Sequence, residues 1–171
     1  MKRVRGWVTS AKVSPQLTTR VVDKVREVFN DYIPDVWIHT DHYKKEQAGP
    51  QPAFAISLQA ETSTGVTYVK DFMFGDQFKM PEELGERCAH AMLDEILTGG
   101  AIDSSNQSTL LMLCALAAGD SISAVKLSRV TQQSVQMLRN LKQFFNVQFK
   151  IKECEDDVFQ SDSDSSDNDE S

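Results

Sequence analysis

The stretch from Ser14 to Tyr32, SPQLTTRVVDKVREVFNDY, predicts one amphipathic helix and sets the order of the elements around it. A serine followed by a proline is typical of a helix start, because proline has no backbone N–H to satisfy there. Apolar side chains then recur at the spacing of one buried stripe. They are Leu17, Val21, Val25, Val28, Phe29 and Tyr32. Pro34 is expected to end the helix.

Strand patterns lie on both sides of this helix. Residues 3–13 precede it with strand-like content, and residues 36–38 open a short strand after it. Residues 44–52 contain a glycine and two prolines and predict a loop. Apolar residues then alternate with small or polar ones over residues 54–59, and a second β-rich run follows the turn signal at 64–65. The order is therefore strand, helix, strand and hairpin.

The pattern changes after Gly75. A helix is expected from Pro81 to Ile96, with acidic residues in its first turn, where the helix dipole favours them. Residues 110–118 are apolar on all sides and predict a buried helix. Residues 124–127 predict a strand, Thr131 begins another helix, and residues 147–151 alternate as a final half-buried strand.

The charge of the chain is concentrated at its C-terminus. The formal net charge is -7, but the segment from Glu155 onward holds 8 acidic residues and neither lysine nor arginine. The remainder has 18 basic against 17 acidic residues and is close to neutral. Serine and aspartate dominate residues 155–171, which predicts a disordered acidic tail. It either keeps the protein soluble or, through spacings such as Ser161 to Asp164, serves as the substrate of an acidophilic kinase.

The cysteines and the hydropathy indicate an intracellular protein. Cys88, Cys114 and Cys154 are odd in number and lack the paired spacing of a zinc or disulfide framework. Because no apolar run reaches the roughly 18 to 20 residues of a membrane span, we expect a soluble protein without a membrane partner.

The histidines do not predict a metal or catalytic site. His39, Asp41 and His42 are residue types that bind zinc, but on a strand 39 and 41 share a face while 42 points the other way. An ordinary strand end is therefore favoured. His90 has no sequence neighbour that would make it a catalytic base.

Four ordered stretches resemble the RNA 3'-terminal phosphate cyclase family. They are residues 2–6 with 13–16, residues 33–42, residues 61–65, and residues 99–107 leading to 141–150. Together they cover nearly all of residues 2–152. The sequence Asp-Ser-Ser-Asn-Gln at 103–107 is more similar to that of the cyclase-like proteins of eukaryotic ribosome biogenesis than to that of the catalytic cyclases.

The resemblance implies an α+β fold in which a large domain, made of repeats of two helices and a four-stranded sheet, is interrupted by a small inserted domain. Residues 1–80 are expected to form the insert, a βαβ unit plus a hairpin, and residues 81–154 the last helix and sheet repeat of the large domain. Residues 155–171 follow as the tail. A full-length member is much longer, so an N-terminal half is expected to be missing, either because the product is shortened or incompletely read, or because that half is encoded elsewhere.

The resemblance also implies where the family's chemistry would lie. Active members carry their nucleotide on a histidine in the turn that matches residues 127–131, and that position holds Val130 here. Valine has no lone pair with which to attack phosphorus. An Asp-Gln pair of the active pocket matches Asn106-Gln107, and the neutral Asn106 cannot be an anionic metal ligand. We therefore expect no catalytic residue, cofactor or metal.

The densest basic set of the chain surrounds this turn. It comprises Lys126, Arg129, Arg139, Lys142, Lys150 and Lys152, with no acidic residue between Asp120 and Glu153. Arg139 and Lys142 are three residues apart and share a helix face. Lys126, Arg129, Arg139 and Lys142 are the predicted contacts to RNA phosphates or a protein partner, and a plain solvated face is the alternative.

The function implied by the resemblance is that of a non-catalytic factor in pre-rRNA processing for the small ribosomal subunit. Such a factor would dock to pre-rRNA and to a ribosome-assembly GTPase in the small-subunit processing complex, in the nucleus and nucleolus. An active cyclase or a pre-rRNA endonuclease are alternatives, although Asp103 and Asp120 are few carboxylates for a metal-dependent nuclease. A third alternative is that the chain is a non-functional fragment, which would unfold on heating without a cooperative transition.

Overall fold

The computed structural model describes residues 1–44, 47–75, 80–117 and 122–153. Their elements are β1 (Arg3–Ala11), α1 (Pro15–Asn30), β2 (Val36–Tyr43), β3 (Ala53–Glu61), β4 (Thr67–Met73), α2 (Pro81–Thr98), α3 (Gln107–Ala117) and α4 (Gln132–Phe145). The predicted acidic tail and Cys154 lie outside the described residues.

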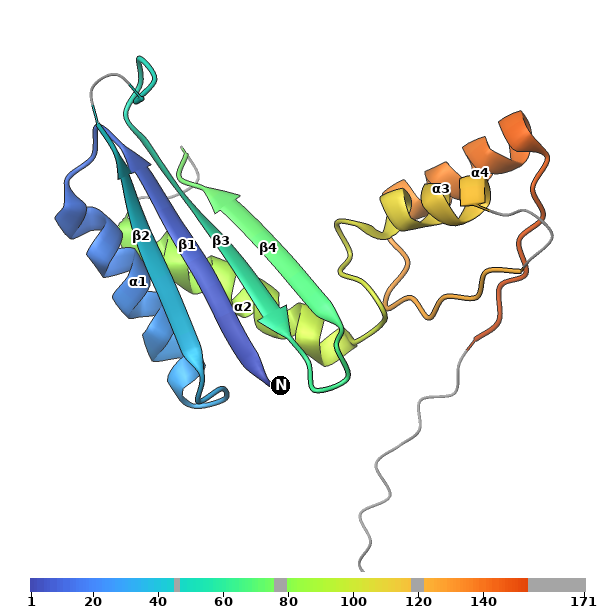
Figure 1. The fold of residues 1–171 in the computed structure, drawn as a ribbon, viewed down its shortest axis with the longest axis horizontal. Helices are drawn as coiled ribbons and strands as arrows, with labels where there is room; N and C mark the ends of the chain where they lie inside the picture. The colour runs from blue at the N-terminus through green and yellow to red at the C-terminus, as the bar shows by residue number, and fades with distance from the viewer. Residues whose placement is uncertain (45–46, 76–79, 118–121, 154–171) are drawn as a thin grey trace, which may run out of the picture.

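Strands β1 to β4 form one mixed sheet in the order β2-β1-β3-β4. The β1 and β2 strands are parallel and are connected by α1, whereas β3 runs antiparallel to both β1 and β4. Both α1 and α2 lie against the same face of this sheet (Figure 1). The predicted βαβ unit with a following hairpin, and the α+β class, are confirmed.

The core lies between the sheet and these two helices. Inward positions of the strands supply Val4, Val8, Ile56 and Leu58, while α1 supplies Val21, Val25 and Phe29 and α2 supplies Leu84, Cys88 and Met92. Each fully buried side chain of this size contributes about 1.5–3 kcal/mol to folding. Because α2 completes this core, the first packing unit extends past the predicted boundary at residue 80 to the end of α2.

Helix α1 forms as its sequence predicts. Ser14 occupies the N-cap and Pro15 the first helical position. Tyr32, the last member of the predicted stripe, is exposed because the helix ends at Asn30. Gly85 of α2 faces α1 so closely that a Cβ atom there would lie 2.7 Å from the carbonyl oxygen of Val21, which explains the glycine at this crossing.

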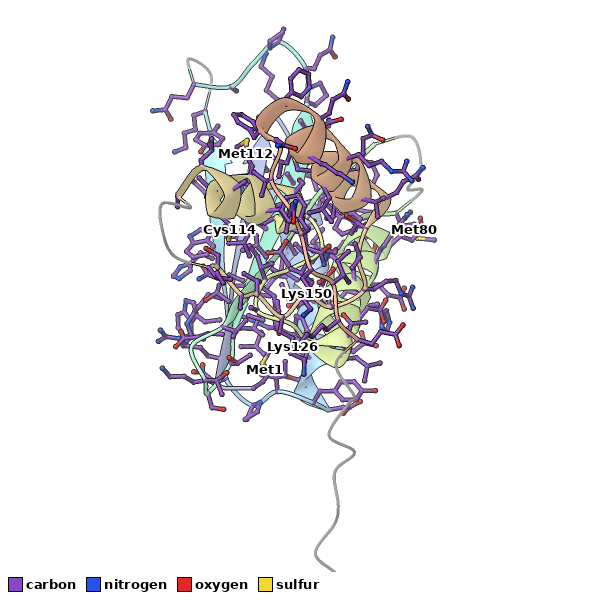
Figure 2. The ribbon with its side chains drawn as sticks, turned by 90° about the vertical axis from the view of Figure 1, so that its right-hand side faces the viewer. Met1, Met80, Met112, Cys114, Lys126 and Lys150 are labelled. Atoms are coloured by element: carbon purple, nitrogen blue, oxygen red, sulfur yellow. The ribbon has the colours of Figure 1, made fainter. Side chains whose placement is uncertain are left out.

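The second half of the chain differs from its prediction. Helix α3 forms, but its predicted burial is wrong, since Leu113 and Leu116 are 54% and 60% exposed. Helices α3 and α4 pack on each other beyond the β4 edge of the sheet, and Met112 and Cys114 lie on α3 in the side view (Figures 1 and 2).

The two strands predicted in the second half are also wrong. Residues 124–127 and 147–151 are extended segments without strand pairing in the described structure. A strand requires a neighbour that accepts and donates its backbone hydrogen bonds, and alternation of side chains alone cannot supply one. Within the described residues, the predicted strand at 124–127 makes one backbone hydrogen bond to another segment. It runs from the Ala101 N–H to the Lys126 carbonyl, at 2.8 Å. The sheet of the predicted last repeat is therefore absent from the described residues.

Candidate functional site

The loop from residue 99 to 106, between α2 and α3, is fastened to the edge strand β4. The Tyr68 hydroxyl donates to the Gly100 carbonyl at 2.8 Å, and the Val69 N–H donates to an Asp103 carboxylate oxygen at 3.4 Å. These bonds place the start of α3 next to the sheet.

A buried ion pair strengthens this attachment. The Lys70 ammonium lies 2.7 Å from a carboxylate oxygen of Glu95, and the two side chains are only 14% and 8% exposed. Ser104 donates to the same carboxylate through its N–H, at 3.0 Å, and through its hydroxyl. Burial raises the pKa of Glu95, but Lys70 and Ser104 outweigh this effect and keep the pKa below its ordinary value. The Glu95 carboxyl group is therefore ionised at neutral pH.

Asp103 and Asn106 form a self-contained turn before α3. The buried Asp103 carboxylate accepts the N–H groups of Ser105 and Asn106, both at 3.1 Å, which is the arrangement that favours a helix start. The Asn106 side-chain amide donates to both carboxylate oxygens at 3.1 Å. Asn106 thus holds Asp103 in place. No group of three or more potential metal ligands occurs among the described residues.

Gln107 joins this loop to the start of α4. Its buried side-chain amide donates to the Ser128 hydroxyl at 3.2 Å and to the Arg129 carbonyl at 3.1 Å. Its oxygen accepts the Thr131 N–H at 3.2 Å and the Ser134 hydroxyl at 3.0 Å. All the hydrogen-bonding capacity of one amide is used to fix one turn.

We call this turn, residues 127–131, the valine turn. Gly100 lies against it with a φ of +105°, and a Cβ atom at Gly100 would lie 2.7 Å from the Ser128 nitrogen. Val130 is 44% exposed at the position where the resemblance implies a histidine. The valine turn is therefore well positioned, but the side chain at the position implied for the nucleophile is apolar.

The other candidate nucleophiles lie elsewhere. His39 and His42 are on β2 and His90 is on α2. His42 faces the inward side of β2, and its Nδ1 lies 2.6 Å from the Ser10 hydroxyl. Burial, with a smaller effect of Asp71, raises the pKa of the Cys88 thiol to about 12, so it stays protonated at neutral pH.

The predicted basic residues are all exposed. Lys126 lies just before the valine turn and Arg129 within it, whereas Arg139 and Lys142 lie toward the other end of α4. None of the four has an ion pair within the described part of the chain. At 1.5 Å per residue, Arg139 lies about 10 Å and Lys142 about 15 Å along the axis from the start of α4.

The four cations therefore fall into two pairs, one at the valine turn and one on α4; we call these four residues the basic line. Figure 2 looks onto this end of the molecule and labels Lys126 on the segment that leads to α4 and Lys150 on the segment that follows it. The role of the basic line in binding stays a prediction.

Sequence reasoning missed two features. Glu95 follows Met92 by three residues on the buried stripe of α2, and an acid at such a position signals a buried partner. Trp7 was counted with its strand, but the period of two places it opposite the buried Val8, on the outer face of the sheet. The alternation of buried and exposed residues along β1 could therefore have shown that Trp7 faces outward.

Comparison with known proteins establishes the family. The family model for the insert domain of RNA 3'-terminal phosphate cyclase (RTC) matches residues 1–97, more than half of the 171 residues. The chain belongs to the RNA 3'-terminal phosphate cyclase family. This match ends next to the end of α2, where the first packing unit also ends.

Relatives of known name are found in its cyclase-like branch. The "RNA 3'-terminal phosphate cyclase-like protein" of Homo sapiens and that of Mus musculus are each 41% identical over 156 residues, which is 89% of this chain and 42% of the relative. The "rRNA processing protein rcl1" of Schizosaccharomyces pombe is 35% identical over 90% of this chain and 42% of its own length. The chain thus spans less than half the length of these relatives. None of the helices in the described ranges is long and apolar enough to cross a membrane.

Proposed function

We propose that this chain is a non-catalytic, RNA-binding part of a cyclase-like factor that acts in pre-rRNA processing for the small ribosomal subunit. The names of its relatives, one of them an rRNA processing protein, support this role. The observation that carries the proposal is the valine turn, which is fixed by Gln107, has Val130 in place of a nucleophile, and is flanked by exposed cations.

The chemistry at the valine turn favours binding over reaction. Covalent nucleotidyl transfer requires a side chain with an available lone pair, and Val130 has none. Asn106 and Gln107, which match the Asp-Gln pair of the active pocket, use their amides inside the protein. The turn can therefore position neighbouring groups against a partner, whereas Val130 itself cannot attack a phosphorus.

RNA is the partner that suits the basic line. Its exposed cations lie along about 15 Å of α4 and the turn before it, so they meet successive phosphates of an extended strand and not one compact anion. Neither Arg129 nor Lys142 is neutralised by a carboxylate of the described residues.

The proposal extends to partners and place. In the cell, the chain would dock to a ribosome-assembly GTPase within the small-subunit processing complex, in the nucleus and nucleolus, as the resemblance implies. The exposed Leu113, Leu116 and Phe144 on α3 and α4 support a protein contact here, because apolar side chains of this size rarely remain open together.

A matched pair of triple variants tests the RNA contact. The variant Arg129→Ala, Arg139→Ala, Lys142→Ala removes three charges from the basic line. The variant Arg20→Ala, Lys24→Ala, Arg26→Ala removes three from α1, at the opposite end of the molecule (Figure 1). Binding of a labelled single-stranded pre-rRNA fragment is measured by anisotropy at several salt concentrations.

We expect the first variant to bind the RNA at least tenfold more weakly than the parent chain. The slope of log K against log salt concentration should fall in magnitude by about 2, since each phosphate contact contributes about 0.7 to that slope for a single strand. The α1 variant should keep both values close to those of the parent chain. Equal losses in the two variants, or none, would contradict the proposed surface.

A further inference from the structure

The outer face of the sheet, opposite α1 and α2, is open (Figure 1). It carries large aromatic side chains on β1 and β2, with Trp7 44% exposed and Trp37 58% exposed. The chain has two tryptophans, and both lie on this face.

The rings form a continuous strip across the two strands. Trp7 and His39 are paired in the strand register and stack with ring centroids 5.8 Å apart and an interplanar angle of 21°. His39 also contacts Trp37, at 6.0 Å between centroids. We call Trp7, Trp37 and His39 the aromatic strip.

Two shallow hollows meet at Trp7. One, of about 390 Å³, is walled by Trp7 and Met73 and has the small side chains of Ala55 and Ser57 on its wall. The other, of about 320 Å³, is lined by Trp7 together with Arg3, Arg5, Gln59 and Glu61. One tryptophan ring thus borders a largely apolar hollow and a hollow with two guanidinium groups.

Carboxylates hold these guanidinium groups in place. Arg5 forms two hydrogen bonds of 2.9 Å with the Asp35 carboxylate, and Arg3 lies 2.6 Å from Glu61. Lys2 also contacts Glu61, at 2.7 Å. Three cations therefore face two carboxylates, which leaves one positive charge in excess at this end of the face. Beyond the rings, Asp41 lies on β2 next to Thr9, whereas Asp71 on β4 is in register with Ser57 and Trp7; both carboxylates are exposed.

We infer that the outer sheet face binds a single-stranded segment of RNA, with unpaired bases stacked on the aromatic strip and the phosphates nearest them at Arg3 and Arg5. Flat aromatic rings across neighbouring strands, next to arginines, are the arrangement on which successive bases stack, whatever their sequence. The exposed carboxylates of Asp41, beyond the rings, and Asp71, beside them, repel phosphates, which leaves the arginine end of the face for the phosphates. This inference rests on the proposed RNA-binding function but uses a different surface from the basic line.

The chemistry of the face favours RNA over a protein partner. Beside the rings, outer positions of the central strands hold Thr9, Ala55, Ser57 and Gln59, none of them a large aliphatic residue. A protein-binding face of this size would gain most from burying such residues in its centre. A base gains instead from a flat ring and from polar edges that accept hydrogen bonds.

The intrinsic tryptophan fluorescence of the whole chain tests the inference directly, because both tryptophans lie on this face. An unlabelled ten-nucleotide single-stranded RNA of mixed sequence is titrated into the protein, beside a duplex of the same sequence and a ten-unit abasic phosphodiester. We expect saturable quenching by the single strand, and little by the duplex or the abasic strand, because only unpaired bases stack on the rings.

Two variants, compared with the basic-line variant, separate this face from the basic line. Trp7→Leu keeps an apolar side chain without a ring, and Tyr32→Ala removes an exposed aromatic side chain just after α1 as the matched control. We expect Trp7→Leu to weaken binding of the single strand about tenfold, from the loss of one stacked base, and Tyr32→Ala to leave it unchanged. Circular dichroism verifies that each variant is folded.

Two outcomes would overturn the inference. If the single strand binds, as anisotropy reports, without changing the tryptophan fluorescence, the RNA lies on the basic line alone and the outer face is left to a protein partner. If the basic-line variant abolishes binding while Trp7→Leu has no effect, the proposed function stands and this inference fails. If neither the parent chain nor any variant binds RNA, both the proposed function and this inference are wrong.

Discussion

Replacing Glu95 with alanine is expected to lower the free energy of unfolding by about 3–5 kcal/mol, the cost of leaving a buried charge without its partner. Lys70 is only 14% exposed, so its ammonium group would lose its carboxylate without gaining water. Ser104 would lose the acceptor of both its N–H and its hydroxyl. Urea unfolding followed by circular dichroism at neutral pH measures the loss.

Two further variants identify the cause. Replacing both partners, Lys70→Met with Glu95→Leu, should recover most of the stability, because no charge is then left buried. Glu27→Ala, which removes the exposed partner of Lys24 on α1, should leave the unfolding midpoint unchanged. If Glu95→Ala were as mild as Glu27→Ala, the buried pair would not hold the loop to the sheet.

The same pair gives a pH dependence of known sign. The pKa of Glu95 lies below its ordinary value of 4.5 in the folded chain, so its contribution to stability is present above that value and lost as the pH falls through the lower, folded one. The stability difference between the parent and a Glu95→Gln variant should therefore stay constant down to about pH 5 and shrink below it.

Replacing Gln107 with methionine, which is similar in size and apolar, should release the valine turn. The Arg129 carbonyl and the Thr131 N–H would each lose a buried partner, at about 1–3 kcal/mol per group. Because α3 and α4 pack beside the sheet core and not within it, the loss should appear as local opening more than as global unfolding.

Amide hydrogen exchange is the appropriate measurement for this second prediction. In Gln107→Met, the Thr131 N–H should exchange at least tenfold faster, which corresponds to a loss of about 1.4 kcal/mol, while the amides of β1 and β3 should be unaffected. Gln133→Met, on the exposed side of α4, is the matched control. Unchanged protection of Thr131 would show that Gln107 does not fix the turn.

The first half of the fold could be predicted because its signals are local. The stripe of α1 and the alternation of β1 and β3 each specify an element and its buried face. Residues 147–151 alternate equally well and form no strand, because pairing depends on a neighbour that a local pattern does not identify. The apolar α3 is exposed for a similar reason: composition predicts burial but not the surface that provides it.

The candidate site was predictable in its residue types and not in its contacts. The position of Val130 and of the Asn106-Gln107 pair followed from the resemblance, yet the hydrogen bonds of Gln107 to the valine turn join residues more than twenty positions apart. The outward position of Trp7, by contrast, could have been inferred from the period of two that places it opposite Val8. A sheet face is identified only once the register of β1 with β2 brings Trp7 beside His39.

The most direct test of the central claim, that this chain binds RNA without changing it, follows the fate of the RNA. A single-stranded pre-rRNA fragment labelled at its 5' end and carrying a 3'-terminal phosphate is incubated with the chain, ATP and Mg²⁺. A native gel then reports binding, and a denaturing gel reports length and end group. We predict a shifted band on the first gel and, on the second, full-length RNA with its 3'-phosphate intact. A cyclic end, a cleaved product or the absence of any shifted band would contradict the account.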